Sequence, residues 1–194
     1  MFEEVIDVVT EDGKMNTYIY RPDEGGPFPV VLFFMDAAGV REALADMCRR
    51  LASAGYFVAM PNLFYRKARY VDINVDRFAT DPAYGETTDL LWSLNNHLTN
   101  SMVMRDTAAL LSRLDADRMA RPGKIGLLGY CMSGKFVYRG AADFADRVAA
   151  AVAMYGNPLV SDAPDSAHLT TGKISGEIYF GFVEQELFYS AVDM

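Results

Sequence analysis

Apolar runs recur along the chain and alternate with segments of helical period. Val30–Met35 and Lys124–Gly129 are rich in apolar residues, which is typical of strands buried on both faces of a parallel sheet. Between them, apolar side chains at three- and four-residue spacing predict a helix over Arg41–Ala54, and a short strand follows at Tyr56–Met60. Strand, helix and strand in this order predict a right-handed parallel crossover and therefore the α/β class.

The two ends of the chain extend this pattern. Strand-forming residues at Val5–Thr10 and Met15–Tyr20 flank a turn-forming stretch, which predicts an antiparallel hairpin at a sheet edge. Val148–Tyr155 and Gly176–Phe182 predict two more strands, separated by a segment rich in Pro and Asp. We therefore predict a single domain over residues 1–194, with a mostly parallel sheet flanked by helices.

Three further helices complete the predicted architecture. Helical periodicity is present at Arg105–Leu114 and Ser133–Ala142. Residues 62–100 show few clear periods, and we read them as an irregular excursion with a short helix near Thr87–Leu98.

Composition narrows the function classes. The formal charge of -8 argues against a nucleic-acid partner, because phosphate backbones would be repelled. The amino terminus lacks a secretory signal and no stretch is long enough for a membrane span, so we expect a cytoplasmic protein with no membrane partner. The only cysteines, Cys48 and Cys131, and the two histidines form no recognisable metal spacing, so we predict thiols, no metal and no cofactor.

The predicted strand at Lys124–Gly129 runs directly into the predicted helix through a tight turn, and Cys131 stands at its apex. Gly129 and Gly134 flank it, as a sharp strand-to-helix turn requires, although Ser133 occupies the last small position of the usual pattern. The turn predicts a nucleophilic thiol whose pKa the helix terminus lowers. The structural alternative is a small buried cysteine that only packs.

Backbone N–H groups near this turn would stabilise an oxyanion on a substrate carbonyl. Met132 N–H is one predicted donor. Ala37 N–H, in the small-residue loop Met35–Val40 after the central strand, is the second.

The same stretch also admits a nucleotide-binding interpretation. Gly129–Lys135 spells the first seven positions of a phosphate-binding loop. Phe136 then replaces the Ser or Thr that would hold Mg²⁺, which disfavours nucleotide hydrolysis.

The turn Gly129–Gly134, with sequence G-Y-C-M-S-G, resembles the G-Y-C-x-G-G elbow of the dienelactone hydrolase family. Phe33–Ala37, Pro61–Arg66 and Ala163–Leu169 resemble further segments of the same family, so the likeness covers nearly the whole chain. The resemblance implies hydrolysis of esters or lactones by a Cys-His-Asp triad, with Cys131 as the nucleophile.

The resemblance also implies roles for other residues. Asp36 lies where the family has an acidic residue near the elbow, and it could contact substrate. Glu186, in Glu184-Gln185-Glu186, matches the triad acid, with glutamate in place of aspartate. The alternative for Glu186 is a solvated loop charge.

The triad histidine has no counterpart. Family members continue to an E-H-G-F-like segment, whereas this sequence stops at Met194, and neither His97 nor His168 matches that segment. We interpret His97 as a surface or packing residue. His168 is a candidate for a structural or substrate-pocket role and, less favoured, for a replacement base.

These departures predict a domain that lacks the last strand and helix of its family, through truncation, frameshift or fragmentation. An exposed sheet edge would then favour either a marginal monomer or a homodimer. The leading hypothesis is a hydrolase of small esters or lactones, whose acyl-enzyme stalls after one turnover if no base replaces the histidine. The alternative is a catalytically impaired remnant that only binds small molecules.

Overall fold

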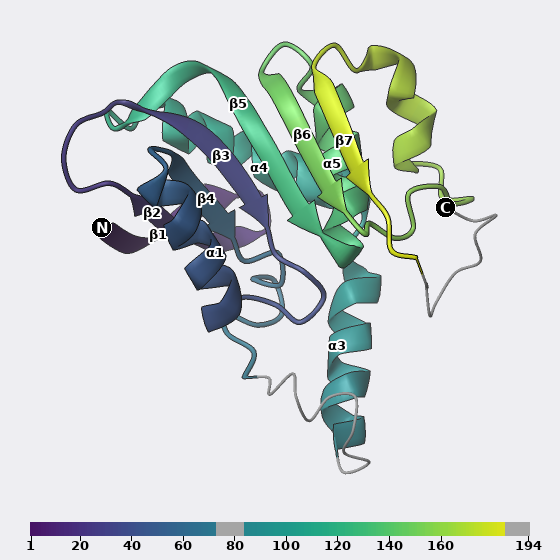
Figure 1. Cartoon of the computed structure of the whole chain (residues 1–194). Helices are drawn as coiled ribbons and strands as arrows, with labels where there is room; N and C mark the ends of the chain where they lie inside the picture. Colours follow the sequence, from purple (N-terminus) through teal and green to yellow (C-terminus); the bar gives the residue numbers. More distant parts are fainter. Residues whose placement is uncertain (73–83, 185–194) are drawn as a thin grey trace.

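The computed structural model describes residues 1–72 and 84–184, and a seven-stranded sheet forms their centre (Figure 1). The strands are β1 (Phe2–Thr10), β2 (Gly13–Arg21), β3 (Phe28–Phe34), β4 (Phe57–Pro61), β5 (Ala120–Tyr130), β6 (Val148–Met154) and β7 (Glu177–Gly181). Their order is β1-β2-β4-β3-β5-β6-β7. The pairs β1/β2 and β2/β4 are antiparallel and the others are parallel. The predicted α/β class and the edge hairpin are confirmed.

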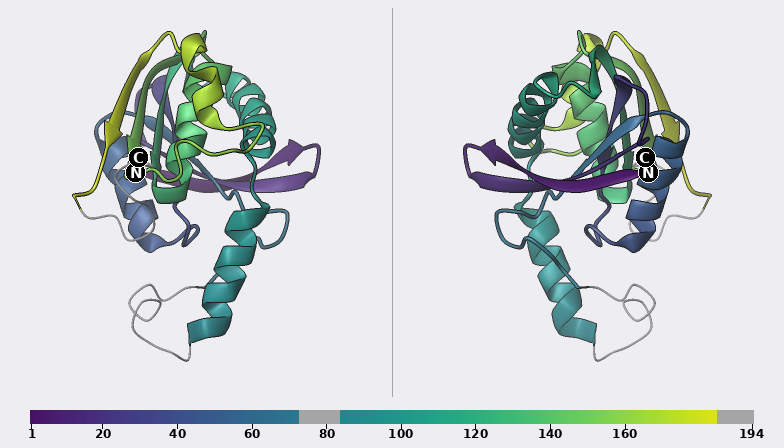
Figure 2. Two further views of the ribbon diagram at one scale, coloured as in Figure 1. Left: turned by 90° about the vertical axis from the view of Figure 1, so that its right-hand side faces the viewer. Right: turned by 90° about the vertical axis from the view of Figure 1, so that its left-hand side faces the viewer.

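Helices cover the two faces of the sheet unequally. They are α1 (Glu42–Ser53), α3 (Gly85–His97), α4 (Asn100–Asp115) and α5 (Gly134–Asp143), with short 3₁₀ helices η2 (Cys131–Ser133) and η3 (Ala167–Lys173). Figures 1 and 2 show α1 on one face and α4 with α5 on the other, while α3 projects away from the sheet. The predicted helices are therefore present, with boundaries shifted by a few residues.

The sheet changes its winding direction at β3. From β3 the chain crosses through α1 to β4 on one side, and it later returns to β5 on the other side of β3. The carboxyl ends of β3 and β5 consequently meet at a topological switch point, where ligands bind in open α/β sheets. The loop after β3 and the turn after β5 both begin there.

A buried ion pair ties the hairpin to α4. The two terminal guanidinium nitrogens of Arg66, Nη1 and Nη2, each donate to the Asp106 carboxylate at 2.8 Å. The Tyr65 hydroxyl donates to the same carboxylate at 2.9 Å. Arg66 also bonds Asp12 at 2.8 Å, and Thr10 shares a 2.7 Å hydrogen bond with Tyr65. The side chains of Arg66 and Asp106 are 8% and 3% exposed. We call these five residues the hairpin cluster, and they fasten the β1–β2 turn to the body of the protein.

Candidate active site

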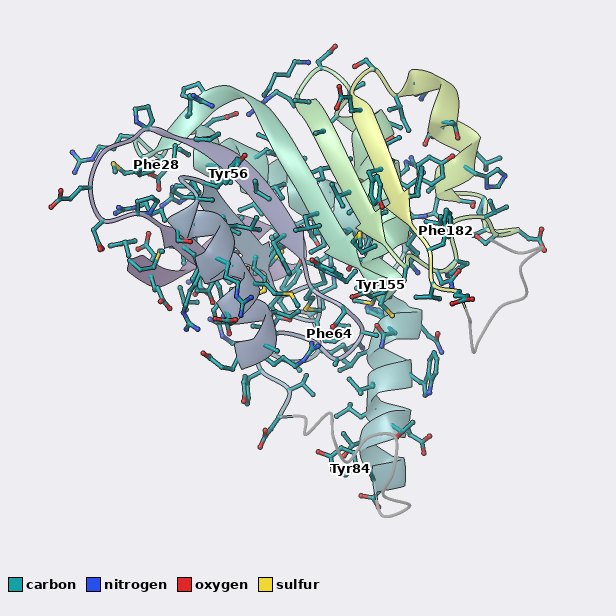
Figure 3. All side chains as sticks on the ribbon, in the orientation of Figure 1. Phe28, Tyr56, Phe64, Tyr84, Tyr155 and Phe182 are labelled. Carbon is teal, nitrogen blue, oxygen red and sulfur yellow. The ribbon has the colours of Figure 1, made fainter. Side chains whose placement is uncertain are left out.

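Three chain segments meet at the carboxyl edge of the sheet. β3, β5 and β6 are parallel neighbours, so the residues that follow them lie at the same edge. Tyr130 pairs with Met154 in the register of β5 and β6, which brings the next residues, Cys131 and Tyr155, side by side. Figure 3 shows Tyr155 at this edge, beyond the arrowheads of the strands.

Cys131 and Tyr155 both have strained backbones. Their φ angles are 54° and 41°, and within the described residues they are the only non-glycine residues with positive φ. Such conformations cost about 1–3 kcal/mol each and persist where the surrounding structure requires them, often at functional sites. The prediction that Cys131 stands at the apex of a sharp strand-to-helix turn is confirmed.

Close backbone packing explains the glycines around Cys131. A Cβ added to Gly134 would lie 2.3 Å from the Cα of Gly156, and one added to Gly129 would lie 2.8 Å from a methyl of Val137. The backbone N–H of Asn157 also donates to the Cys131 carbonyl at 3.3 Å. Residues 129–134, which we call the elbow, are therefore held directly against the segment that follows β6.

A side-chain hydrogen bond joins the elbow to the end of β3. Ser133 is fully buried, and its hydroxyl donates to the carbonyl of Met35. The serine that departs from the usual small-residue pattern thus has a structural use, because it links the turn after β5 to the loop after β3.

The two cysteines occupy opposite environments. Cys131 is exposed at the elbow, whereas Cys48 is buried in α1 beside Met60. Burial raises the pKa of the Cys48 thiol well above its ordinary value. A buried thiol of this kind is chemically inert, so of the two cysteines only Cys131 is accessible to a substrate.

The loop after β3, residues 35–41, is held by hydrogen bonds of its own; we call it the β3 loop. Arg41 donates to the two carboxylate oxygens of Asp36 at 2.5 and 2.6 Å. The Ala38 N–H donates to the same carboxylate at 3.0 Å, and the Gly39 N–H donates to the Asp36 carbonyl at 3.1 Å. Asp36 is thus engaged in fixing its own loop, and substrate contact by Asp36 stays a prediction.

The N–H of Ala37 is among the backbone donors that the hydrogen bonds of the β3 loop leave open. Among the described residues, no acceptor is bonded to the N–H of Ala37, although the groups on either side of it are bonded. An open N–H flanked by fixed peptides is what an oxyanion donor requires.

Tyr155 borders the elbow with its aromatic ring. The ring centroids of Tyr155 and Tyr130 are 5.6 Å apart. Burial raises the pKa of Tyr155, and the nearby negative charges of Asp36 and a Cys131 thiolate raise it further. The phenol therefore remains a neutral hydrogen-bond donor at neutral pH.

Comparison with known proteins identifies the family. A sequence model of the Dienelactone hydrolase family matches residues 15–193. The chain belongs to this family. Three observations thus support the assignment of residues 129–134 as the elbow of this dienelactone hydrolase family member: their sequence, the strained backbone of Cys131 and their position at the topological switch point.

Named relatives agree with this assignment. A protein of Methylorubrum extorquens described as "Putative carboxymethylenebutenolidase" is 30% identical over 159 residues, which cover 81% of this chain and 50% of that protein. An Escherichia coli protein of the same description is 31% identical, over 77% of this chain and 51% of its own length. The chain spans about half the length of these curated relatives.

Solved structures show the same fold. A Klebsiella pneumoniae protein described as "Putative Dienelactone Hydrolase" aligns with a TM-score of 0.69 at 20% identity, over 99% of this chain and 92% of its own. A dienelactone hydrolase-like promiscuous phosphotriesterase from metagenomic libraries aligns with a TM-score of 0.63 at 20% identity, over 98% of this chain and 73% of its own. The α/β-hydrolase fold is therefore shown.

Neither histidine makes a described contact with Cys131. His168 lies in η3, which packs on α5, and its Nδ1 shares a 2.8 Å hydrogen bond with the hydroxyl of Ser166. His97 ends α3 and is exposed, in agreement with its interpretation as a surface residue. The proposed triad acid, Glu186, lies outside the described residues.

The phosphate-loop interpretation finds no support in the structure. Gly129 and Tyr130 belong to β5, and Gly134 and Lys135 belong to α5. Only Cys131–Ser133 remain between strand and helix, which are too few residues to wrap a phosphate. The family comparisons also give no support to nucleotide binding.

Within residues 1–72 and 84–184, no helix combines the length and apolar character needed to cross a bilayer. The same ranges contain no grouping of three or more His, Cys, Asp or Glu side chains suited to a metal ion.

Sequence reasoning missed Arg41, Tyr155 and Asn95. Tyr155 ends a predicted strand just before Gly156, which could have marked it as a strand-end residue at the sheet edge. The helical pattern marks Arg41 only as the start of a helix. Asn95 carried no signal at all, because its partner in the β3 loop is 58 residues away.

Proposed function

We propose that this protein cleaves carboxylic ester or lactone bonds by forming a thioester on Cys131. The observation that carries the proposal is the strained, exposed Cys131 at the switch point. Its neighbour in the three-dimensional structure, the β3 loop, offers the open N–H of Ala37. Membership of the dienelactone hydrolase family supports the same reaction class.

The first step is acylation of the thiol. The Cys131 thiolate attacks the substrate carbonyl carbon, and the carbonyl π electrons move to oxygen to give a tetrahedral oxyanion. The oxyanion then re-forms the carbonyl to give the thioester as the carbon–oxygen single bond breaks. The electron pair of that bond leaves with the alcohol oxygen, which takes a proton from water unless it is stable as the anion, as a phenolate is. A lactone opens in the same way but keeps its alcohol attached to the acyl group.

The backbone N–H groups of Met132 and Ala37 stabilise the oxyanion in this proposal. Met132 is the second residue of η2, directly after the nucleophile. A preorganised donor of this kind is worth about 10²–10³-fold in rate. Tyr155 supplies an aromatic wall beside the reacting carbon.

The second step is hydrolysis of the thioester, and it needs a base that removes a proton from water. His168 is the histidine to test first, although its Nδ1 is bonded to Ser166. Without a base, the acyl group stays on Cys131 and the protein releases one alcohol per site.

The descriptions of the relatives suggest a substrate class. Carboxymethylenebutenolidase, the description of the Methylorubrum extorquens and Escherichia coli proteins, names an enzyme that acts on an unsaturated lactone. We propose small activated esters and enol lactones as the substrates, because their alcohols leave readily from a tetrahedral intermediate.

A chromogenic phenyl ester tests both steps at neutral pH. We expect a burst of phenolate equal to the protein concentration, present in the wild type and in Cys48→Ala but lost in Cys131→Ala. A continued steady phase that falls in His168→Ala would identify the base. Release of phenolate by Cys131→Ala at the wild-type rate would refute the proposal.

A further inference from the structure

Asn95 makes a side-chain contact that links α3 to the β3 loop. Asn95 lies in the last turn of α3, and its Nδ2 donates to the carbonyl of Ala37 at 3.2 Å. The same amino group donates to the carbonyl of Leu91 at 2.8 Å. One amide group therefore anchors the residue that carries the open N–H to a helix distant in sequence.

The orientation of this amide is fixed by its two partners. Both are carbonyl oxygens, which only accept hydrogen bonds, so the amino end of Asn95 must face them. Asn95 Oδ1 is buried and has no hydrogen-bond partner among the described residues. An unpaired buried acceptor costs about 1–3 kcal/mol, and an apolar side chain would avoid that cost. The donor function of the amide thus explains why an asparagine, rather than an apolar residue, suits this position.

The contact completes a set of restraints around the Ala37 N–H. The peptide before Ala37 is held by Gly39 N–H on the Asp36 carbonyl. The peptide after Ala37 is held at its N–H by the Asp36 carboxylate and at its carbonyl by Asn95. Asn95 is the only one of these restraints that comes from outside the β3 loop.

We infer that Asn95 is a positioning residue that fixes the direction of the Ala37 N–H toward the oxyanion formed at Cys131. The inference rests on the proposed function and deepens it. Asn95 does not touch the reacting atoms; it restrains the peptide that follows the one carrying the Ala37 N–H, so that little reorganisation of the loop is needed as charge develops. Its loss should slow acylation and leave the thiol itself unchanged.

The matched pair Asn95→Asp and Asn96→Asp isolates the contact. Asp is nearly isosteric with Asn but would set a carboxylate against two carbonyl oxygens, whereas Asn96 is exposed on the same helix and receives the same added charge. Asn95→Ala, which removes the amide without adding charge, is the second variant in case the charged one folds poorly.

Two reactions of Cys131 separate positioning from general damage. Phenolate burst kinetics report acylation, which needs the oxyanion donor, and iodoacetamide alkylation reports the thiol, which needs none. We expect Asn95→Asp to slow the burst at least about tenfold, Asn95→Ala to slow it in the same direction, and Asn96→Asp to leave it unchanged. Alkylation should proceed equally in all four proteins. Equal slowing of both reactions, or a wild-type burst rate in Asn95→Asp, would overturn the inference.

Amide hydrogen exchange of residues 35–41 tests the anchor without any catalysis. We expect faster exchange in both Asn95 variants and wild-type exchange in Asn96→Asp. A wild type without a burst would refute the proposed function, and exchange alone would then decide whether Asn95 anchors the loop. Unchanged exchange in the Asn95 variants would overturn the anchoring itself.

Discussion

Two regions of the molecule concentrate polar groups but use them in opposite ways. One is the hairpin cluster. The other is the elbow together with the β3 loop, which we call the elbow edge. In the hairpin cluster, the carboxylate of Asp106 accepts hydrogen bonds from the Tyr65 hydroxyl and from both terminal guanidinium nitrogens of Arg66, and it is almost wholly buried. At the elbow edge, Cys131 is exposed, and Ala37 N–H has no acceptor in the described part of the chain. The first arrangement is closed and the second is open.

The difference shows what each region contributes. A closed polar network in a low-dielectric interior joins elements firmly and offers nothing to a ligand. An open one retains unused bonding capacity and keeps strained backbones, as at Cys131 and Tyr155, because the surrounding packing compensates for the strain. The comparison therefore predicts that changes in the hairpin cluster affect stability alone. Changes at the elbow edge should affect reactivity, or both reactivity and stability.

The strongest effect should come from the glycine contact that supports the elbow. Gly134→Ala places a methyl 2.3 Å from the Gly156 Cα, so the backbones must separate. We expect a loss of about 3 kcal/mol or more in the free energy of unfolding, with a weaker burst per folded molecule. Gly172→Ala is the control, because a Cβ there meets nothing within 4 Å and should change stability by less than about 0.5 kcal/mol. Denaturant titration would measure both, and a stable, reactive Gly134→Ala would contradict the packing argument.

Asp106→Asn tests the closed region. Arg66 would keep its charge without its buried partner, which costs about 3 kcal/mol of unfolding free energy. The burst per folded molecule should be unchanged, since among the described residues no hydrogen bond joins Asp106 to the elbow or to the β3 loop. Asp12→Asn removes the partly exposed partner of the same Arg66 and should cost less than about 1 kcal/mol. A slower burst in Asp106→Asn would show that the two regions are coupled.

The smallest effect concerns Asp165, which joins the start of α4 to the segment before η3. Burial opposes its ionisation, but hydrogen bonds from the Ser101 N–H and hydroxyl outweigh burial and hold the pKa of Asp165 below its usual value. A depressed carboxyl pKa stabilises the fold above the unfolded-state pKa, and that stability is lost as the pH falls through the folded-state pKa. Asp165→Asn should therefore be less stable than wild type at pH 7, by about 0.5 kcal/mol after solvent screening, and the gap should narrow at an acidic pH below the folded-state pKa of Asp165. A gap of the same size at both pH values would contradict this assignment.

The sequence predicted the elements that carry strong periodic patterns. The apolar run of β3 and the spacing of α1 are recoverable because burial dictates their residues, and the elbow is recoverable because its turn needs glycine. The Asp36–Arg41 ion pair and the Asn95 contact were not recoverable, since each depends on a loop conformation that has no residue period. Tyr155 is a different case: its place at the end of a predicted strand could mark it as a sheet-edge residue, but its left-handed backbone leaves no compositional mark.

Mass spectrometry of the protein after mixing with a phenyl ester tests the central claim most directly. The account predicts a mass gain of one acyl group per chain, located on the proteolytic peptide that contains Cys131 and absent from the peptide that contains Cys48. The adduct should be released by hydroxylamine, as thioesters are. An acyl group on another side chain, or no adduct under conditions in which phenolate is released, would contradict Cys131 as the nucleophile.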